Sequence, residues 1–75
     1  MQMADVVIHI DETVDHDRRT AIADIVRDHK GVMGVAHHDE KPHLMIVEYD
    51  PGVISAHVLL DAVKAEGVHA ELVGM

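Results

Sequence analysis

The sequence predicts an α+β domain in which four antiparallel strands form one sheet and two helices cover one of its faces. Three observations predict this class. Runs of β-branched residues recur along the chain, and two further segments have the apolar spacing of helices. Glycine residues or the sequence Asp-Pro-Gly, which favour turns, separate these segments. Because a chain of 75 residues has no room for a second core, we expect one domain over residues 1–75.

The first strand is expected over residues 5–11, where apolar side chains alternate at Val6, Ile8 and Ile10. A helix is expected next, with Asp15 or Asp17 as its N-cap and Gly31 after its end. Residues at i, i+3, i+4 and i+7 spacing predict its buried side: Ile22, Ile25, Val26 and His29.

A hairpin is expected after this helix, with strands over 32–38 and 43–49 and a polar turn over 39–42. The second of these strands begins apolar on both sides, so we expect it in the centre of the sheet. Ser55 is the expected N-cap of a second helix, and Gly67 is expected to end it. The buried side of this helix is predicted at Leu59, Ala62 and Val63. The last strand is expected over residues 68–73. This order is the ferredoxin-like split βαβ arrangement, with the second face of the sheet open.

Composition excludes several classes of function. A formal charge of −8 with six Lys and Arg residues argues against a nucleic-acid partner. Eight histidines make that charge dependent on pH. No apolar run has the length of a membrane span, and the first residues lack the parts of a signal peptide, so we expect a soluble cytoplasmic protein.

Four landmarks occur in a fixed order along the chain: Gly31-Val32, Val47-Glu48-Tyr49-Asp50-Pro51, Leu59 with Ala62-Val63, and Glu66-Gly67-Val68. In order and spacing they resemble the heavy-metal-associated domain family, which includes copper chaperones, metal-ATPase amino-terminal modules and mercury-handling proteins. The resemblance covers residues 6–73. It implies metal-ion binding and transport, with a metal-transport ATPase or a related protein as partner.

The family's metal motif, Gly-Met-x-Cys-x-x-Cys, is absent, because the chain contains no cysteine. Counting back from Gly31 places Asp15 and Arg18 where the family has its two thiols. A Cu(I) thiolate site is therefore not expected, since Cu(I) requires soft sulfur donors.

Two interpretations of the loop remain open. In the first, Asp15, His16 and Asp17, with Glu12 as a further donor, bind a divalent ion such as Zn(II), Ni(II), Co(II), Mn(II) or Cu(II). In the second, Arg18 pairs with Asp15 or Asp17 and holds the loop in shape without a metal.

Two other histidine groups offer alternative metal sites. His37, His38 and His43 flank the hairpin turn, although adjacent strand residues point to opposite faces. On the open sheet face, His9 and His69 are expected to be cross-strand neighbours, with Glu48 and Glu71 nearby. For both groups, polar side chains exposed to solvent are the simpler explanation.

The same open face is expected to expose four apolar residues: Val7, Leu44, Ile46 and Val73. Such a patch favours a homodimer through the sheet, or an alternative function as a metal-free interaction module. We expect no enzymatic activity. Ser55 is better explained as a cap, and a ferredoxin-like acylphosphatase would need an Asn, which the chain lacks.

Overall fold

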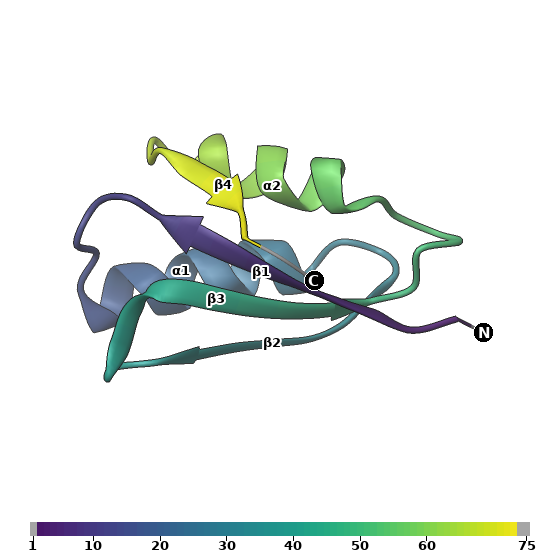
Figure 1. Cartoon of the computed structure of the whole chain (residues 1–75), viewed down its shortest axis with the longest axis horizontal. Helices are drawn as coiled ribbons and strands as arrows, with labels where there is room; N and C mark the ends of the chain where they lie inside the picture. The colour runs from purple at the N-terminus through teal and green to yellow at the C-terminus, as the bar shows by residue number, and fades with distance from the viewer. Residues whose placement is uncertain (1, 74–75) are drawn as a thin grey trace.

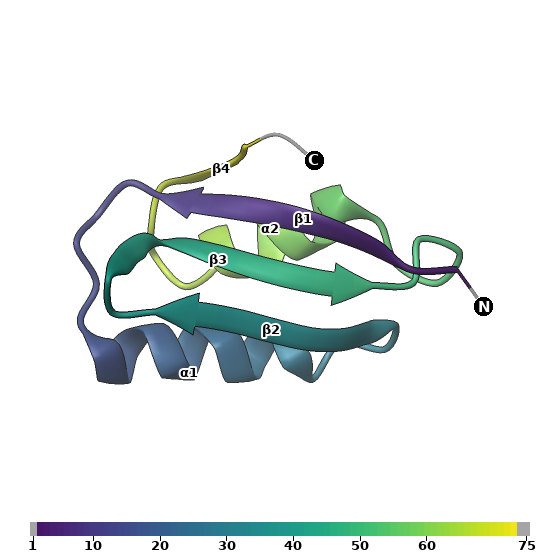
Figure 2. The ribbon, with the colours of Figure 1, turned by 60° about the horizontal axis from the view of Figure 1, so that its bottom comes forward.

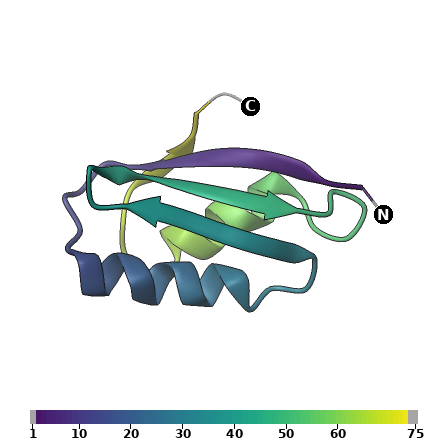
Figure 3. The same ribbon diagram turned by 90° about the horizontal axis from the view of Figure 1, so that it is seen from below.

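A computed structural model of the chain describes residues 2–73 and contains one sheet and two helices. The antiparallel sheet has the order β2-β3-β1-β4, and both helices lie on one of its faces (Figures 1 and 3). The predicted ferredoxin-like α+β fold is confirmed. In chain order the elements are β1 (Ala4–Ile10), α1 (His16–Arg27), β2 (Val32–His38), β3 (Lys41–Tyr49), α2 (Ala56–Lys64) and β4 (Ala70–Leu72).

The core lies between the helices and the central strands β1 and β3. Alternate residues of β1 point toward the helices, and their cross-strand partners on β3 are buried beside them: Val6 pairs with Val47, and Ile8 with Met45. As predicted, β3 is central in the sheet. The core side chains are aliphatic except for Tyr49; the largest fully buried ones are Ile8, Ile10, Ile22, Met45, Leu59, Val6, Val26, Val47 and Val63.

The buried side of α1 differs from the prediction. Ile25 is 38% exposed, so its assignment to the core was wrong. The buried residues instead begin one turn earlier at Arg19 and keep the i, i+3, i+4, i+7 spacing: Arg19, Ile22, Ala23 and Val26. Hydrophobicity pointed to Ile25 and away from Arg19, because arginine is rarely buried.

The hairpin is tighter than predicted. Its turn consists of Asp39 and Glu40, because β3 begins at Lys41 and includes Pro42. The pairing of β2 with β3 is irregular between His37 and His38, and such bulges accommodate proline near a strand end.

The second half of the chain follows the prediction more closely. The Ser55 hydroxyl accepts a hydrogen bond from the Val58 backbone N–H (3.2 Å), so Ser55 is the N-cap of α2. Leu59 and Val63 are fully buried. β4 is shorter than the predicted 68–73. Among residues 2–73, neither helix has the length and apolar character needed to cross a bilayer.

Candidate metal centre

Three connections meet at one end of the molecule: the β1–α1 loop, the β2–β3 turn and the segment that leads into β4 (Figure 2). The loop is the place where the sequence predicts a metal site. Because β1 and β2 end there while β3 and β4 begin there, side chains from distant parts of the sequence come together at this end.

The three predicted loop ligands have different roles. The Asp15 carboxylate accepts a hydrogen bond from the Arg18 backbone N–H (2.8 Å) and is therefore the N-cap of α1. His16 Nδ1 lies 3.0 Å from Asp39 Oδ1 across the β2–β3 turn. Asp17 lies exposed in the first turn of α1. Whether Asp15, His16 and Asp17 bind an ion stays a prediction.

Arg18 does not make the side-chain pair expected with Asp15 or Asp17. Its guanidinium donates to the Glu66 carbonyl oxygen and lies 3.8 Å from the Glu66 carboxylate. The loop is therefore connected to the end of α2 rather than closed on itself.

Arg19 is the residue at this end that sequence reasoning missed. Its side chain is 4% exposed, and its guanidinium donates to the Val14 carbonyl oxygen (3.1 Å), to His37 Nδ1 (3.3 Å) and to the Asp39 carboxylate. One buried cation thus joins α1, the loop and the β2–β3 turn. Its position three residues before Ile22 was the one available signal.

The contacts and charges of this network make His37 unsuitable as a metal ligand. Burial, followed by the positive charge of Arg19, lowers the pKa of His37. Since His37 Nδ1 accepts a hydrogen bond from Arg19, the proton of the neutral ring is on Nε2, and neither nitrogen is a free donor to metal. The hydrogen bond from His16, together with Arg19, lowers the pKa of Asp39.

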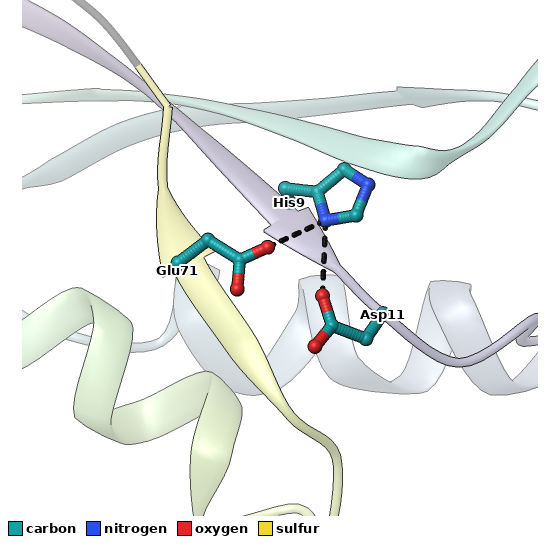
Figure 4. A group of neighbouring side chains, drawn as sticks. All are labelled: His9, Asp11 and Glu71. Atoms are coloured by element: carbon teal, nitrogen blue, oxygen red, sulfur yellow. Dashed lines mark hydrogen bonds and ion pairs between the residues drawn. The ribbon is translucent and has the colours of Figure 1, made fainter.

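A second group lies on the open face of the sheet. His9 Nδ1 is 2.8 Å from Glu71 Oε1 and 3.2 Å from Asp11 Oδ1 (Figure 4). One ligand atom from each residue lies within 4.8 Å of the others. We call His9, Asp11 and Glu71 the open-face triad. Within residues 2–73 it is the one set of three His, Cys, Asp or Glu residues that meets this spacing.

The hairpin histidines are not brought together. His37 bonds to Arg19, His38 is exposed, and His43 Nδ1 donates to the Ile10 carbonyl oxygen (2.8 Å). The His43 ring instead stacks on His9, with centroids 5.6 Å apart and planes inclined by 20°.

The predicted cross-strand pairing of His9 with His69 was wrong. The register of β1 and β4 places Glu71 opposite His9. His69 lies two residues earlier, and its ring nitrogen Nδ1 is 2.6 Å from the Glu12 carboxylate. The Glu12 carboxylate also accepts from the His69 backbone N–H (2.8 Å). The prediction identified the neighbouring strands correctly but not their register.

The pairing of His69 with Glu12 leads to a testable pH dependence. Their hydrogen bond raises the pKa of His69 above its ordinary 6.5 and lowers that of Glu12 below its ordinary 4.5. The His69 contribution to stability is complete below pH 6.5 and is lost as pH rises through the raised pKa. The Glu12 contribution is complete above pH 4.5 and is lost as pH falls through the lowered pKa.

We therefore expect the pair to stabilise the fold fully between pH 4.5 and 6.5. NMR titration of the His69 ring in the wild type and in Glu12→Gln measures the effect. In the variant the His69 midpoint should fall toward its ordinary value, and an unchanged midpoint would contradict the pairing.

The chain is similar to known proteins in fold rather than in sequence. No family model and no curated protein sequence matches the chain. Solved structures do match. Oxidized MerP from Ralstonia metallidurans CH34 has a TM-score of 0.84 at 15% identity, covering 95% of this chain and 97% of that one. This chain has the same fold.

Two copper-related domains are similar to the same degree. A copper binding domain from HMA7, a P-type ATPase, has a TM-score of 0.83 at 11% identity and covers 93% of both chains. The yeast copper transporter domain CCC2A has a TM-score of 0.82 at 17% identity, covering 93% of this chain and 94% of its own. At these identities the likeness establishes the fold.

Proposed function

We propose that this chain is a divergent heavy-metal-associated domain that binds and carries a metal ion through imidazole and carboxylate groups instead of thiolates. The observation that best supports the proposal is the open-face triad, in which an imidazole and two carboxylates converge at the loop end of the molecule. The similar structures include a copper binding domain and a copper transporter domain, so the same fold serves metal binding elsewhere.

The donor types determine which ions the proposal includes. Without cysteine, the chain offers nitrogen and oxygen atoms, which suit Zn(II), Ni(II), Co(II) and Cu(II) better than Cu(I). Because one similar domain belongs to a P-type ATPase, a metal-transport ATPase is a reasonable partner to test. A cytoplasmic location stays a prediction. We propose binding rather than catalysis, since Ser55 is occupied as a helix cap.

Isothermal titration calorimetry of the full chain tests metal binding. We expect one equivalent of at least one of Zn(II), Ni(II), Co(II) or Cu(II) to bind more tightly than to an unstructured histidine-containing peptide of the same length. Absence of such binding for all four ions would contradict the proposal. His16→Ala tests the predicted ligands Asp15, His16 and Asp17, with exposed His57→Ala as the matched control.

A second candidate function, self-association, is favoured by a hollow on the open face. Its volume is about 540 Å³, and its apolar lining residues are Val7, Ala36, Leu44 and Ile46. Val7, Leu44 and Ile46 were predicted to lie together. The polar lining residues are His38, Glu40 and Lys41.

A second copy related by a two-fold axis would pack the same apolar side chains against each other and remove them from water. We expect sedimentation equilibrium to detect a dimer at high concentration and Ile46→Lys to abolish it. Ile46 is 38% exposed, so this change does not disturb the core. A chain that is strictly monomeric at millimolar concentration would rule out the candidate.

A further inference from the structure

We propose that His9, Asp11 and Glu71 form a binding site for a divalent cation of the zinc class on the open face of the sheet, separate from the loop at residues 15–17. The inference rests on the proposed function and adds a location, a ligand set and an ion class to it. None of Asp15, His16 and Asp17 takes part in this site.

The backbone of two strands positions the three side chains. His9 and Asp11 are two residues apart and so project from the same face of the sheet. Glu71 lies directly opposite His9 in the antiparallel register. The Asp11 N–H donates to the His69 carbonyl oxygen (2.8 Å), which extends the pairing of β1 and β4 past the end of β1. Ligands on paired strands are held more precisely than ligands on a loop.

The spacing of the donor atoms suits a zinc-sized ion. Ligand atoms bonded to Zn(II) at about 2.0–2.2 Å in a tetrahedral arrangement lie about 3.4 Å from one another. His9 Nδ1 is already 2.8 Å from Glu71 Oε1 and 3.2 Å from Asp11 Oδ1. Both carboxylate oxygens therefore lie within about 0.6 Å of ligand spacing from His9 Nδ1, so small side-chain movements bring each of them to that spacing.

The triad also has more acceptors than a single proton can satisfy. Two carboxylates point at one imidazole nitrogen, which carries at most one hydrogen (Figure 4). A divalent cation in place of that proton interacts with both carboxylates and with the nitrogen lone pair. Among the ion pairs of residues 2–73, none places a Lys or Arg against these two carboxylates. The loop differs, because Arg18 and Arg19 lie beside it.

The surroundings favour an exchangeable ion. The His9, Asp11 and Glu71 side chains are 36%, 51% and 54% exposed, which leaves room for water or for a donor from another protein. His43 is a positioning residue. Its Nδ1 is fixed on the Ile10 carbonyl, and its ring stacks against His9. One imidazole with two carboxylates favours Zn(II), Co(II) or Ni(II) over Mg(II) and Ca(II), which prefer sites made wholly of oxygen.

The test uses the full chain at pH 7.5 with Zn(II) in calorimetry and Co(II) as a visible-absorption probe. His9→Ala and Glu71→Gln remove one ligand each, and Glu71→Gln preserves the side-chain shape if His9→Ala fails to fold. His57→Ala and Glu48→Gln are matched controls, because both residues are exposed and lie outside the triad. Far-ultraviolet circular dichroism verifies that each variant is folded.

We expect each triad variant to bind Zn(II) at least about tenfold more weakly and to lose the Co(II) band, while both controls match the wild type. In NMR spectra, Zn(II) should shift the His9 ring signals before those of His16. Binding that is lost in His16→Ala and kept in His9→Ala and Glu71→Gln would overturn this inference and leave the proposed function standing. Binding that none of these variants weakens would also overturn the inference. A wild-type chain that binds neither Zn(II) nor Co(II) would overturn the inference. If it also failed to bind Ni(II) and Cu(II), the proposed function would be overturned too.

Discussion

Replacing Gly31 by alanine is expected to lower the free energy of unfolding by about 2–5 kcal/mol. Gly31 joins α1 to β2 with φ of +96°, a region that costs other residues about 1–2 kcal/mol. An added Cβ would lie 2.8 Å from Val53 Cγ1, 2.9 Å from Val53 Cβ and 3.0 Å from Ile54 Cγ2. Overpacking of this kind costs about 1–3 kcal/mol more.

The backbone cannot easily move away to relieve the contact. The Gly31 carbonyl oxygen accepts a hydrogen bond from the Asp50 N–H (2.8 Å), which holds the start of β2 against the segment after β3. Displacing Gly31 from Val53 would stretch that bond. Contact and strain therefore act together at this position.

Gly67→Ala is the matched control for Gly31→Ala. Gly67 has φ of +87°, but a Cβ there would meet nothing within 4 Å. We expect a loss of about 1–2 kcal/mol from backbone strain alone. Urea denaturation of the two variants and the wild type measures both values. Equal losses would show that the contacts with Val53 and Ile54 are relieved at no cost.

Arg19→Ala is expected to lower the free energy of unfolding by about 2–4 kcal/mol. The change removes packing from a core-facing position of α1 and leaves the Val14 carbonyl oxygen without the guanidinium donor. It also disconnects the β2–β3 turn from the helix, because His37 and Asp39 both lose the same partner. Thermal or urea unfolding measures the loss.

Two variants separate packing from charge at this position. Arg19→Lys keeps the aliphatic stem and a positive charge but lacks the planar fork, so we expect an intermediate loss. Asp39→Asn should cost less than Arg19→Ala, since the Asp39 side chain is 69% exposed. An Arg19→Ala variant as stable as the wild type would mean that the buried guanidinium contributes no net stability.

The order of elements could be predicted from the sequence because its signals are local. Alternation at Val6, Ile8 and Ile10 is produced by the two-residue repeat of a strand, and Ser55 caps the helix that begins immediately after it. Arg19 and Ile25 show where local signals fail. Hydrophobicity favoured Ile25 for the core, yet Arg19 occupies that side because hairpin residues far along the chain provide its partners.

The candidate site was predictable only in part. Alternation places His9 and Asp11 on one face, but their relation to Glu71 depends on how β1 aligns with a strand some 60 residues later. A shift of two residues along the strand keeps every side chain on its face while changing each cross-strand partner. For that reason the sequence indicated Glu71 and His69 together on the open face and assigned the wrong one to His9.

By itself, the sequence determined the class of fold, the absence of thiol chemistry and the presence of imidazole and carboxylate groups near the loop end, because these depend on composition and short-range periodicity. The tertiary structure decided which of those groups meet. His37 became a partner of buried Arg19, and Glu71 a neighbour of His9. Contacts between distant residues follow from strand register and helix packing, which a linear pattern does not specify.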